Sequence, residues 1–373
     1  MLFTPRLTPQ DIEVAGQLDE LWNGLRYQLG QPRRWHGSLR RIIAAKNIQG
    51  SNSIEGYHVS VEDAAALLDG VDAVESNETD AEVVRNYGDA MTYIVTLADD
   101  PQFHYDATLI RSLHYMMMKH DVTVGPGHFR TGPIRVARGT ETLYEGPDAA
   151  DVHPLVQELC DQLNTATVDS HWIEAAMAHL NLVMIHPFKD GNGRMSRALQ
   201  TLVLARARIQ SPAFLSVEEY LGANTQNYYR VLLEVGGPQW DPDRDANAWI
   251  RFNLTAHHRQ AQTVQRRLTE SARLWEAIDA LRAEHSLDER TTGVLYSAAW
   301  GFRVRRRDHQ AYAIDISDRV ANLDLAKLVD VGLLRAVGER RGRHYVAAPA
   351  LTEIRERTRQ PRQPLADPYA DPA

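Results

Sequence analysis

Residues 186–197 read His-Pro-Phe-Lys-Asp-Gly-Asn-Gly-Arg-Met-Ser-Arg, and this stretch connects two apolar segments. Residues 172–185, before it, are rich in Ala, Leu, Met and Val and nearly free of charge. Residues 194–208, after it, place apolar side chains at helical spacing. Both segments are therefore predicted to be core helices. A base, a carboxylate, two glycines and two arginines fall in the short connection between them.

The residues that open the second helix are suited to bind an anion. Gly191 and Gly193 flank Asn192, and glycines let backbone N–H groups point into one concavity at a helix N-terminus, which is partially positive. Arg194 and Arg197 project from the first turn of the same helix. Two guanidinium groups beside such a concavity suit a polyphosphate better than a single phosphate.

Two further side chains of the stretch bring metal-binding and reactive groups. Asp190 is suited to hold a magnesium ion against bound phosphates, and His186 is suited to act as a general base on an attacking hydroxyl. The combination indicates transfer of a phosphate-containing group. Each of these residue types is common in structural turns and on solvated helix faces, so the spacing alone leaves an ordinary loop as the alternative.

The stretch from His186 to Arg197 resembles the signature of the Fic-domain (Fic/Doc) family, His-Pro-Phe-x-(Asp/Glu)-Gly-Asn-(Gly/Lys)-Arg-x-x-Arg, and matches it at every defined position. The resemblance covers residues 36–235. It implies a protein AMP transferase that moves AMP from ATP, with Mg²⁺ or Mn²⁺, onto a Ser, Thr or Tyr hydroxyl. The acceptor is a target protein or the chain itself, and pyrophosphate is released.

The same resemblance implies a role for each matched residue. His186 deprotonates the target hydroxyl and Asp190 binds the metal. The implied ATP-binding residues are Gly191, Asn192, Gly193, Arg194, Arg197 and Tyr228. Among them Arg197 clamps the γ-phosphate and Tyr228 lies on the adenine side, where its neighbour Tyr229 is the alternative. Some relatives carry an asparagine about two turns further on, near Gly236 of this chain.

A flap is predicted before the central stretch. Residues 121–148 are punctuated by Gly and Pro, and Pro133–Arg138 alternates apolar and basic residues, which indicates a half-exposed strand of a β-hairpin. Together with Gly127-His-Phe-Arg130 it resembles the family's flap, which pairs with an extended target segment by strand addition. The implied target-binding residues are Ile134, Arg135 and Val136, and an ordinary surface hairpin is the alternative.

Ser51-Asn-Ser-Ile-Glu55-Gly56 ends a predicted helix at about residues 36–56. By itself it indicates a helix stop at Gly56 beside a surface glutamate. Beside the central stretch it resembles the family's inhibitory signature, (Ser/Thr)-x-x-x-Glu-(Gly/Asn). The resemblance implies that Glu55 forms a salt bridge with Arg197 and keeps Arg197 from the γ-phosphate.

The predicted fold is mainly α: a Fic-type helical bundle with a β-hairpin flap, followed by a C-terminal winged helix of the α+β class. The predicted divisions are a helical region at 1–105, a Fic core at 106–240, a helical connector at 241–286, a winged helix at 287–350 and a disordered tail at 351–373. The connector is predicted to be one long helix with an interruption near Trp275.

The winged helix rests on the order helix (288–300), helix (317–331) and two short strands (334–337 and 344–347). Arginines at 303, 305, 306 and 307 and at 340, 341 and 343 supply local positive charge, so DNA is a candidate partner. Asp318 and Asp324 on the second helix favour docking on protein instead. Two alternatives to the AMP transferase follow: a DNA-binding regulator whose Fic core senses a nucleotide, and a Fic enzyme that transfers another phosphate-containing group.

Composition places the chain among soluble globular proteins. It has 373 residues, 43% hydrophobic and 24% charged, with a net charge of -8 that gives no overall attraction to nucleic acid. Cys160 is the only cysteine, which excludes an intramolecular disulfide and a cysteine-cluster metal site. No apolar run has the length of a signal peptide or a membrane span. A cytoplasmic protein is expected, and its oligomeric state stays open, a homodimer included.

Overall fold

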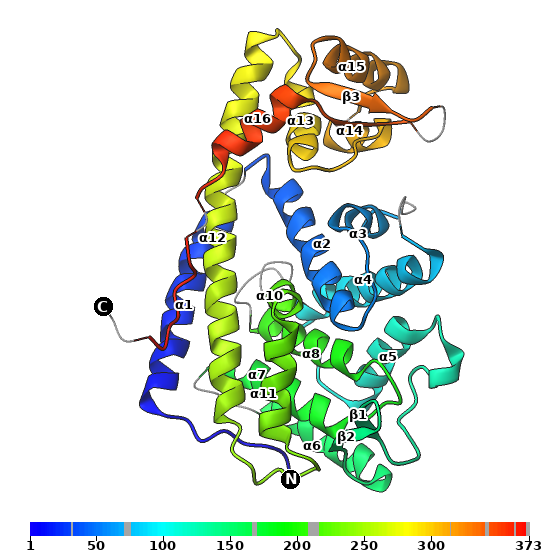
Figure 1. Cartoon of the computed structure of the whole chain (residues 1–373), viewed down its shortest axis with the longest axis vertical. Helices are drawn as coiled ribbons and strands as arrows, with labels where there is room; N and C mark the ends of the chain where they lie inside the picture. The colour runs from blue at the N-terminus through cyan, green and yellow to red at the C-terminus, as the bar shows by residue number, and fades with distance from the viewer. Residues whose placement is uncertain are drawn as a thin grey trace. The chain divides into compact units, whose positions relative to one another are not determined.

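The computed structural model describes residues 1–30, 33–70, 76–165, 170–207, 216–313, 315–339, 343–361 and 363–370. The chain divides into two compact units. Unit 1 comprises Met1–Gly30, Ile43–Ala261 and Leu365–Ala373, and unit 2 comprises Gln31–Ile42 and Gln262–Pro364. Both units are mainly helical, as the sequence predicts, and each contains one small hairpin (Figure 1).

Unit 1 holds the central stretch and the helices around it. Its elements are α1 (Pro9–Gly30), most of α2 (His36–Ile54), α3 (Val61–Leu68), α4 (Glu78–Ala98), α5 (Ala107–Met118), the 3-10 turn η1 (Val122–Val124), β1 (Arg135–Arg138), β2 (Glu141–Glu145), α6 (Ala149–Thr165), α7 (His171–Ile185), α8 (Asn192–Arg206), α10 (Glu218–Ala223), α11 (Thr225–Gly236) and the beginning of α12 (Asn247–Glu284).

Helices α7 and α8 pack against each other at the centre of unit 1 (Figure 1). Nearly every residue of α8 is buried, and Trp172 of α7 stacks on Trp22 of α1 with 5.9 Å between ring centroids. Elsewhere the helices begin where the sequence supplies a cap. The side chains of Ser60, Asn77 and Asp106 each accept a hydrogen bond from a backbone N–H of the first turn of α3, α4 and α5.

The predicted flap is an antiparallel hairpin of β1 and β2 with a bulge between Val136 and Ala137. Every residue of β1 is exposed. Strand β2 is fixed to the core because the Tyr144 hydroxyl donates to the carbonyl of Met184 at 2.5 Å. The hairpin therefore stands over the C-terminal end of α7, where the central stretch begins.

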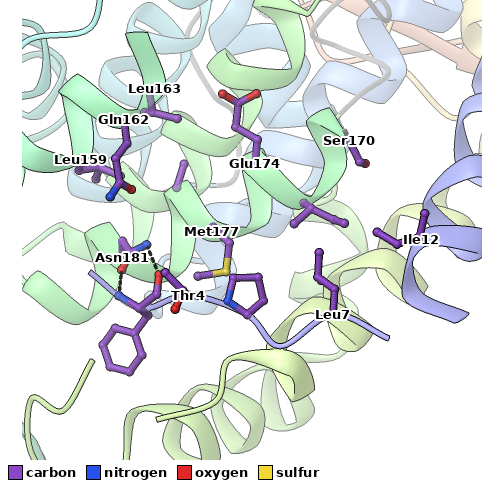
Figure 2. A pocket seen from close by; sticks show the side chains of 14 residues that line it. Thr4, Leu7, Ile12, Leu159, Gln162, Leu163, Ser170, Glu174, Met177 and Asn181 are labelled. Atoms are coloured by element: carbon purple, nitrogen blue, oxygen red, sulfur yellow. Dashed lines mark hydrogen bonds between the residues drawn. The ribbon is translucent and has the colours of Figure 1, made fainter. Parts of the chain in front are cut away.

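The N-terminal segment lies along α7. Its Phe3 donates its N–H to Oδ1 of Asn181 at 2.8 Å and accepts from Nδ2 of the same side chain at 3.2 Å. A groove of about 350 Å³ separates this segment from α6 and α7, and Figure 2 shows Leu7, Leu159 and Met177 among its walls. The groove does not include any residue of the central stretch.

Unit 2 contains the rest of α12, the turn η2 (Glu289–Thr291), α13 (Thr292–Ala299), α14 (Arg306–Tyr312), α15 (Asp318–Asp330), β3 (Leu334–Val337), β4 (His344–Ala347) and α16 (Pro349–Thr358). Strands β3 and β4 pair antiparallel, and Val304 forms a bridge to Tyr345. The winged-helix assignment of this unit stays a prediction.

One of the candidate DNA-contacting arginines of unit 2 and both acidic residues of α15 named above form ion pairs inside the unit. Asp324 accepts from Nε and Nη2 of Arg290 at 2.7 and 2.9 Å, and Arg306 pairs with Asp318 at 2.8 Å. Leu323, on the outer face of α15, is 60% exposed. An exposed leucine between acidic residues does not favour a groove-reading helix. Residues 340 and 341 lie outside the described residues.

Two predictions about the C-terminal half differ from the structure, and one short helix was not predicted. Helix α12 runs without interruption through Trp275, whose ring packs on Tyr296 at 5.4 Å. The basic run continues into α14, which begins where Asp308 accepts from the N–H of Arg305 at 2.6 Å. Residues 351–358, predicted as tail, belong to α16, which buries Leu351. Over the described ranges, no helix has both the length and the apolar character needed to cross a bilayer.

Candidate active site

The loop from His186 to Gly191, the first half of the central stretch, turns sharply because the residue at each of its ends has a left-handed backbone conformation. His186 ends α7 at φ 49° and ψ 57°, and Pro187 cannot continue the helix. Gly191, at φ 79°, precedes the first residue of α8. A Cβ on Gly191 would lie 2.8 Å from Sδ of Met118, so only glycine fits this position.

The His186 side chain is held as a neutral base. Its Nδ1 lies 3.0 Å from the carbonyl oxygen of Val183, and a carbonyl can only accept, so Nδ1 carries the proton. Nε2 therefore keeps its lone pair. Burial lowers the pKa of His186 below its ordinary value of 6.5, which keeps the ring neutral near pH 7. A neutral ring with a free lone pair on Nε2 is what a general base needs, and the role of His186 stays a prediction.

Asn192 shapes the loop with its side chain. Its Oδ1 accepts from the N–H of Phe188 and its Nδ2 donates to the carbonyl of Phe188, both at 2.9 Å. The sequence assigns Asn192 to ATP, but the structure commits both ends of its amide to the loop. Asn192 and Gly193 both line the cavity described below.

Arg130 holds the loop from the outside. Its guanidinium donates to the carbonyls of His186 at 2.9 Å, Gly132 at 2.8 Å and Pro147 at 2.6 Å. Its own N–H donates to the carbonyl of Pro187 at 2.9 Å. The sequence placed Arg130 next to the flap but gave it no role. The structure shows that it fixes the backbone on which His186 stands.

His114 of α5 is a second supporting residue, and no sequence signal pointed to it. Its Nδ1 accepts from the N–H of Gly127 at 2.9 Å, so its Nε2 donates to the carbonyl of Asp190 at 3.0 Å. Its ring stacks on Phe188 with 3.6 Å between centroids. Burial lowers the pKa of His114 to about 4. His114 therefore stays neutral and keeps this donor pattern at physiological pH.

Arg194 has the features of an anion-binding side chain. It is 1% exposed, and both Nε and Nη1 are buried without a hydrogen-bond partner. Its guanidinium lies over the ring of Tyr57 at 5.4 Å, and Nη2 is 4.0 Å from Oδ2 of Asp190. Buried donors are normally paired, because an unpaired one costs free energy. An anion such as a phosphate would supply the missing acceptors.

Arg197 is paired with the predicted inhibitory residues. Its Nη2 lies 2.7 Å from Oε1 of Glu55, and its Nε donates to Oγ of Ser51 at 2.8 Å. Nη2 also donates to the carbonyl of Ser51 at 3.1 Å. Burial alone would lower the pKa of Arg197, but the Glu55 carboxylate raises it above the ordinary value. The arginine is therefore fully charged and held by the end of α2.

Gly193 makes room for this pairing, and Gly56 turns the chain just after Glu55. The φ of Gly56 is 85°. A Cβ on Gly193 would lie only 2.5 Å from Oε1 of Glu55. The Glu55 carboxylate therefore sits directly against the backbone at the start of α8.

A cavity of about 450 Å³ brings these groups together. Its polar part consists of Glu55, His186, Lys189, Asp190, Asn192, Gly193 and Arg197. Its apolar part comes from β2, the last turn of α7 and α11. The flap contributes Val136, Ala137 and Arg138. Of the other predicted target-binding residues, Arg135 pairs with Glu145 at 3.2 Å and Ile134 lies next to Gly146.

The two tyrosines of α11 are placed differently. Tyr228 is 1% exposed, and its hydroxyl lies 2.9 Å from Nε2 of His179 in the core. Tyr229 is 42% exposed, and its hydroxyl donates to the carbonyl of Ile54 at 3.3 Å. Both line the cavity, but Tyr229 is the one with an accessible ring. A base-stacking role therefore suits Tyr229 better than Tyr228.

Asp190 fits the metal that the sequence predicts. Its side chain is 52% exposed and lines the cavity, while Oδ1 accepts from the N–H of Gly191 at 2.7 Å. The described residues contain no cluster of three or more His, Cys, Asp or Glu suited to a metal. Mg²⁺ does not need one, because it is commonly held by one or two carboxylates together with substrate phosphates.

Comparison with known proteins places this site in a family. The model of the Fic/DOC family matches residues 104–204. These residues form a Fic domain. The Fic domain includes His114, Arg130 and the whole central stretch. Ser51, Glu55 and the two tyrosines of α11 lie outside the matched range.

Curated relatives carry the same domain. The protein adenylyltransferase Fic of Aedes aegypti is 32% identical over 168 residues, which are 43% of this chain and 32% of the relative. The protein adenylyltransferase fic-1 of Caenorhabditis elegans is 36% identical over 113 residues, which are 29% of this chain and 21% of the relative. The chain thus matches a third or less of the length of these two relatives.

Solved structures share the fold over a longer range. A Fic family protein from Desulfovibrio desulfuricans G20 has a TM-score of 0.59 at 22% identity, covering 93% of this chain and 99% of that one. The Fic-1 structure of Caenorhabditis elegans has a TM-score of 0.51 at 22% identity, covering 69% and 70%. At this identity the likeness shows that the fold is of the Fic type.

Proposed function

We propose that this chain is a self-inhibited protein adenylyltransferase, which transfers AMP from ATP to a Ser, Thr or Tyr hydroxyl of a target protein or of itself. One observation carries the proposal. A neutral histidine, an exposed carboxylate, an open backbone at a helix N-terminus and a buried arginine all line one cavity of about 450 Å³. The names of the curated relatives support the same activity.

In this mechanism Nε2 of His186 accepts the proton of the target hydroxyl. The hydroxyl oxygen bonds to the α-phosphorus, the bond between the α-phosphorus and the bridging oxygen breaks, and pyrophosphate leaves with that oxygen. The N-terminus of α8 holds the phosphates in place, and the buried guanidinium of Arg194, which is not part of the cavity wall, adds positive charge beside it. Asp190 would hold Mg²⁺ or Mn²⁺, which neutralises charge on the phosphates when bound.

The target reaches the site along the flap. Among the described residues β1 pairs only with β2, and it is exposed along its whole length. An extended target segment can add to its outer edge through backbone hydrogen bonds. Because these bonds do not depend on side chains, β1 positions the hydroxyl near His186 without dictating the target's sequence.

Self-inhibition follows from the Arg197–Glu55 pair. With Glu55 at 2.7 Å, Arg197 is not available to the γ-phosphate. The Glu55 carboxylate also lies against Gly193, where phosphates would approach the backbone. Productive ATP binding therefore requires Glu55 to leave.

The activity is tested with the Glu55→Gly variant, called the unbraked variant below. We expect mass spectrometry to find added AMP after incubation with ATP and Mg²⁺, and no adduct when His186→Ala is introduced as well. His128→Ala, at an exposed histidine outside the cavity, serves as the matched control and should keep the adduct. AMP transfer that persists without His186 would refute its role as the base, and no adduct in the unbraked variant would refute the function.

A further inference from the structure

Different elements of the fold line the part of the cavity suited to phosphates and the part suited to a nucleobase. The N-terminus of α8 and the loop before it supply the groups suited to phosphates. The rest of the wall comes from β2, α7 and α11 and is mostly aliphatic: Leu143, Val183, Met184, Leu232 and Leu233. A nucleoside triphosphate with its phosphates on α8 therefore places its base among these aliphatic side chains and the exposed ring of Tyr229.

Three tyrosine hydroxyl groups near this part of the cavity have partners within the chain, and Arg138 of the exposed strand β1 is a further polar lining residue. The Tyr144 hydroxyl donates to the carbonyl of Met184 at 2.5 Å, and the Tyr229 hydroxyl donates to the carbonyl of Ile54 at 3.3 Å. The Tyr228 hydroxyl bonds to Nε2 of His179 at 2.9 Å. The hydroxyl protons of these tyrosines are therefore already used, so the tyrosines are not free to donate to a base that enters here.

Met184 also fills the space beside the end of α11. A Cβ on Gly236 would lie 2.8 Å from Sδ and 2.9 Å from Cε of Met184. The thioether thus occupies the position that a side chain at residue 236 would need. Methionine is unbranched and flexible, so it adapts to ligands of different outline.

We propose that the site holds the nucleobase by stacking on Tyr229 and by apolar contact, and therefore transfers GMP, CMP and UMP as well as AMP. This inference rests on the proposed function. The reason is that an apolar pocket selects among related ligands much less strongly than a hydrogen-bonding site does. An apolar pocket separates related ligands by roughly 10- to 200-fold, whereas a site built to hydrogen-bond a ligand rejects the wrong one by roughly 10⁴- to 10⁵-fold.

The test uses the full-length unbraked variant with ATP, GTP, CTP and UTP, each labelled at the α-phosphate, in the presence of Mg²⁺. We expect all four to label protein, with kcat/KM values that span less than about 200-fold and purines ahead because their larger rings stack better. A span wider than about 200-fold in favour of ATP would overturn the proposal while leaving the proposed function intact. If no nucleotide labels protein, the proposed function itself fails.

The role of Tyr229 is tested by Tyr229→Ala in the same variant. Loss of a stacking ring should raise KM for all four nucleotides by about tenfold, with kcat little changed. Tyr93→Ala, which removes an exposed tyrosine of α4, is the matched control and should leave every KM unchanged. A rise in KM for ATP alone would show that Tyr229 reads the adenine edge, and an unchanged KM would show that it does not hold the base. Either result overturns the proposal.

Discussion

Replacing Glu55 with glycine should raise kcat/KM for AMP transfer, and the size of the increase can be worked out from the Arg197–Glu55 contact. The Glu55 carboxylate pairs with Arg197 at 2.7 Å, and Arg197 is 1% exposed. To reach a γ-phosphate in the wild-type protein, Arg197 must first lose this partner. In the Glu55→Gly variant no carboxylate has to be displaced. Ser51 still accepts from Nε of Arg197 at 2.8 Å and keeps the side chain in place.

Breaking a buried ion pair from one side costs on the order of 3–5 kcal/mol. The side chain of Glu55 is 20% exposed, so water takes it up once it turns away, and the lower end of that range applies. About 3 kcal/mol corresponds to roughly a 100-fold change in an equilibrium constant. We therefore expect the unbraked variant to raise kcat/KM for AMP transfer by about 100-fold.

The assay is incorporation of α-labelled ATP into protein, measured over a range of ATP concentrations. Glu55→Gln keeps the shape of the side chain but removes its charge, so its gain should fall between wild type and the unbraked variant. Glu82→Gln, at an exposed glutamate of α4, is the matched control and should resemble wild type. Equal labelling by wild type and the unbraked variant would refute the reasoning.

Two further substitutions and one change of pH test how the loop backbone and His186 are held, each measured in the unbraked variant. Arg130→Lys removes guanidinium hydrogen bonds to four backbone carbonyls and should lower kcat/KM at least about tenfold, whereas Arg230→Lys, on the exposed side of α11, should not. Gly191→Ala forces alanine to φ 79° and against Met118, so urea unfolding should show a loss of about 1–3 kcal/mol. Because burial lowers the pKa of His186, its neutral form persists below pH 6.5. The rate should therefore stay level from pH 8 to 6.5 and fall only below that, and a midpoint at or above 6.5 would contradict the assignment.

Helical periodicity and capping residues predicted most of the fold. The two strands of unit 2 were placed at the bounds the structure has, Leu334–Val337 and His344–Ala347. The short helices α14 and α16 were missed because their stability comes from tertiary contacts. In α16, for example, burial of Leu351 and an Arg355–Glu270 pair at 3.3 Å hold ten residues that have weak local signals.

The site was predictable where the motif fixes a residue's place in the loop. It was less predictable where the orientation of a helix decides which side chain faces the cavity. His186, Asp190 and Arg197 meet in one cavity as the sequence predicts. Tyr228 and Tyr229 are adjacent in sequence but point about 100° apart on a helix. Which of them faces the core depends on how α11 packs, and that is not encoded in their spacing.

His114 illustrates the remaining gap. A histidine in a helix with buried leucines gives no sign of a role, because the groups it bonds, the N–H of Gly127 and the carbonyl of Asp190, are backbone atoms of distant loops. Backbone partners leave no pattern in the sequence. The same holds for Arg130, whose hydrogen bonds all go to main-chain carbonyls, those of His186 and Pro187 in the loop among them.

In the proposed function, Gly193 accounts for the mutual exclusion of inhibition by Glu55 and binding of a nucleotide. Glycine is the residue that lets phosphates approach the N-terminus of α8 closely. The same missing side chain lets Oε1 of Glu55 reach a point 2.5 Å from where a Cβ would stand. The carboxylate therefore occupies the space that opens the phosphate site and at the same time neutralises Arg197. Because the Glu55 side chain both fills the space beside Gly193 and pairs with Arg197, a phosphate cannot reach either residue without displacing Glu55.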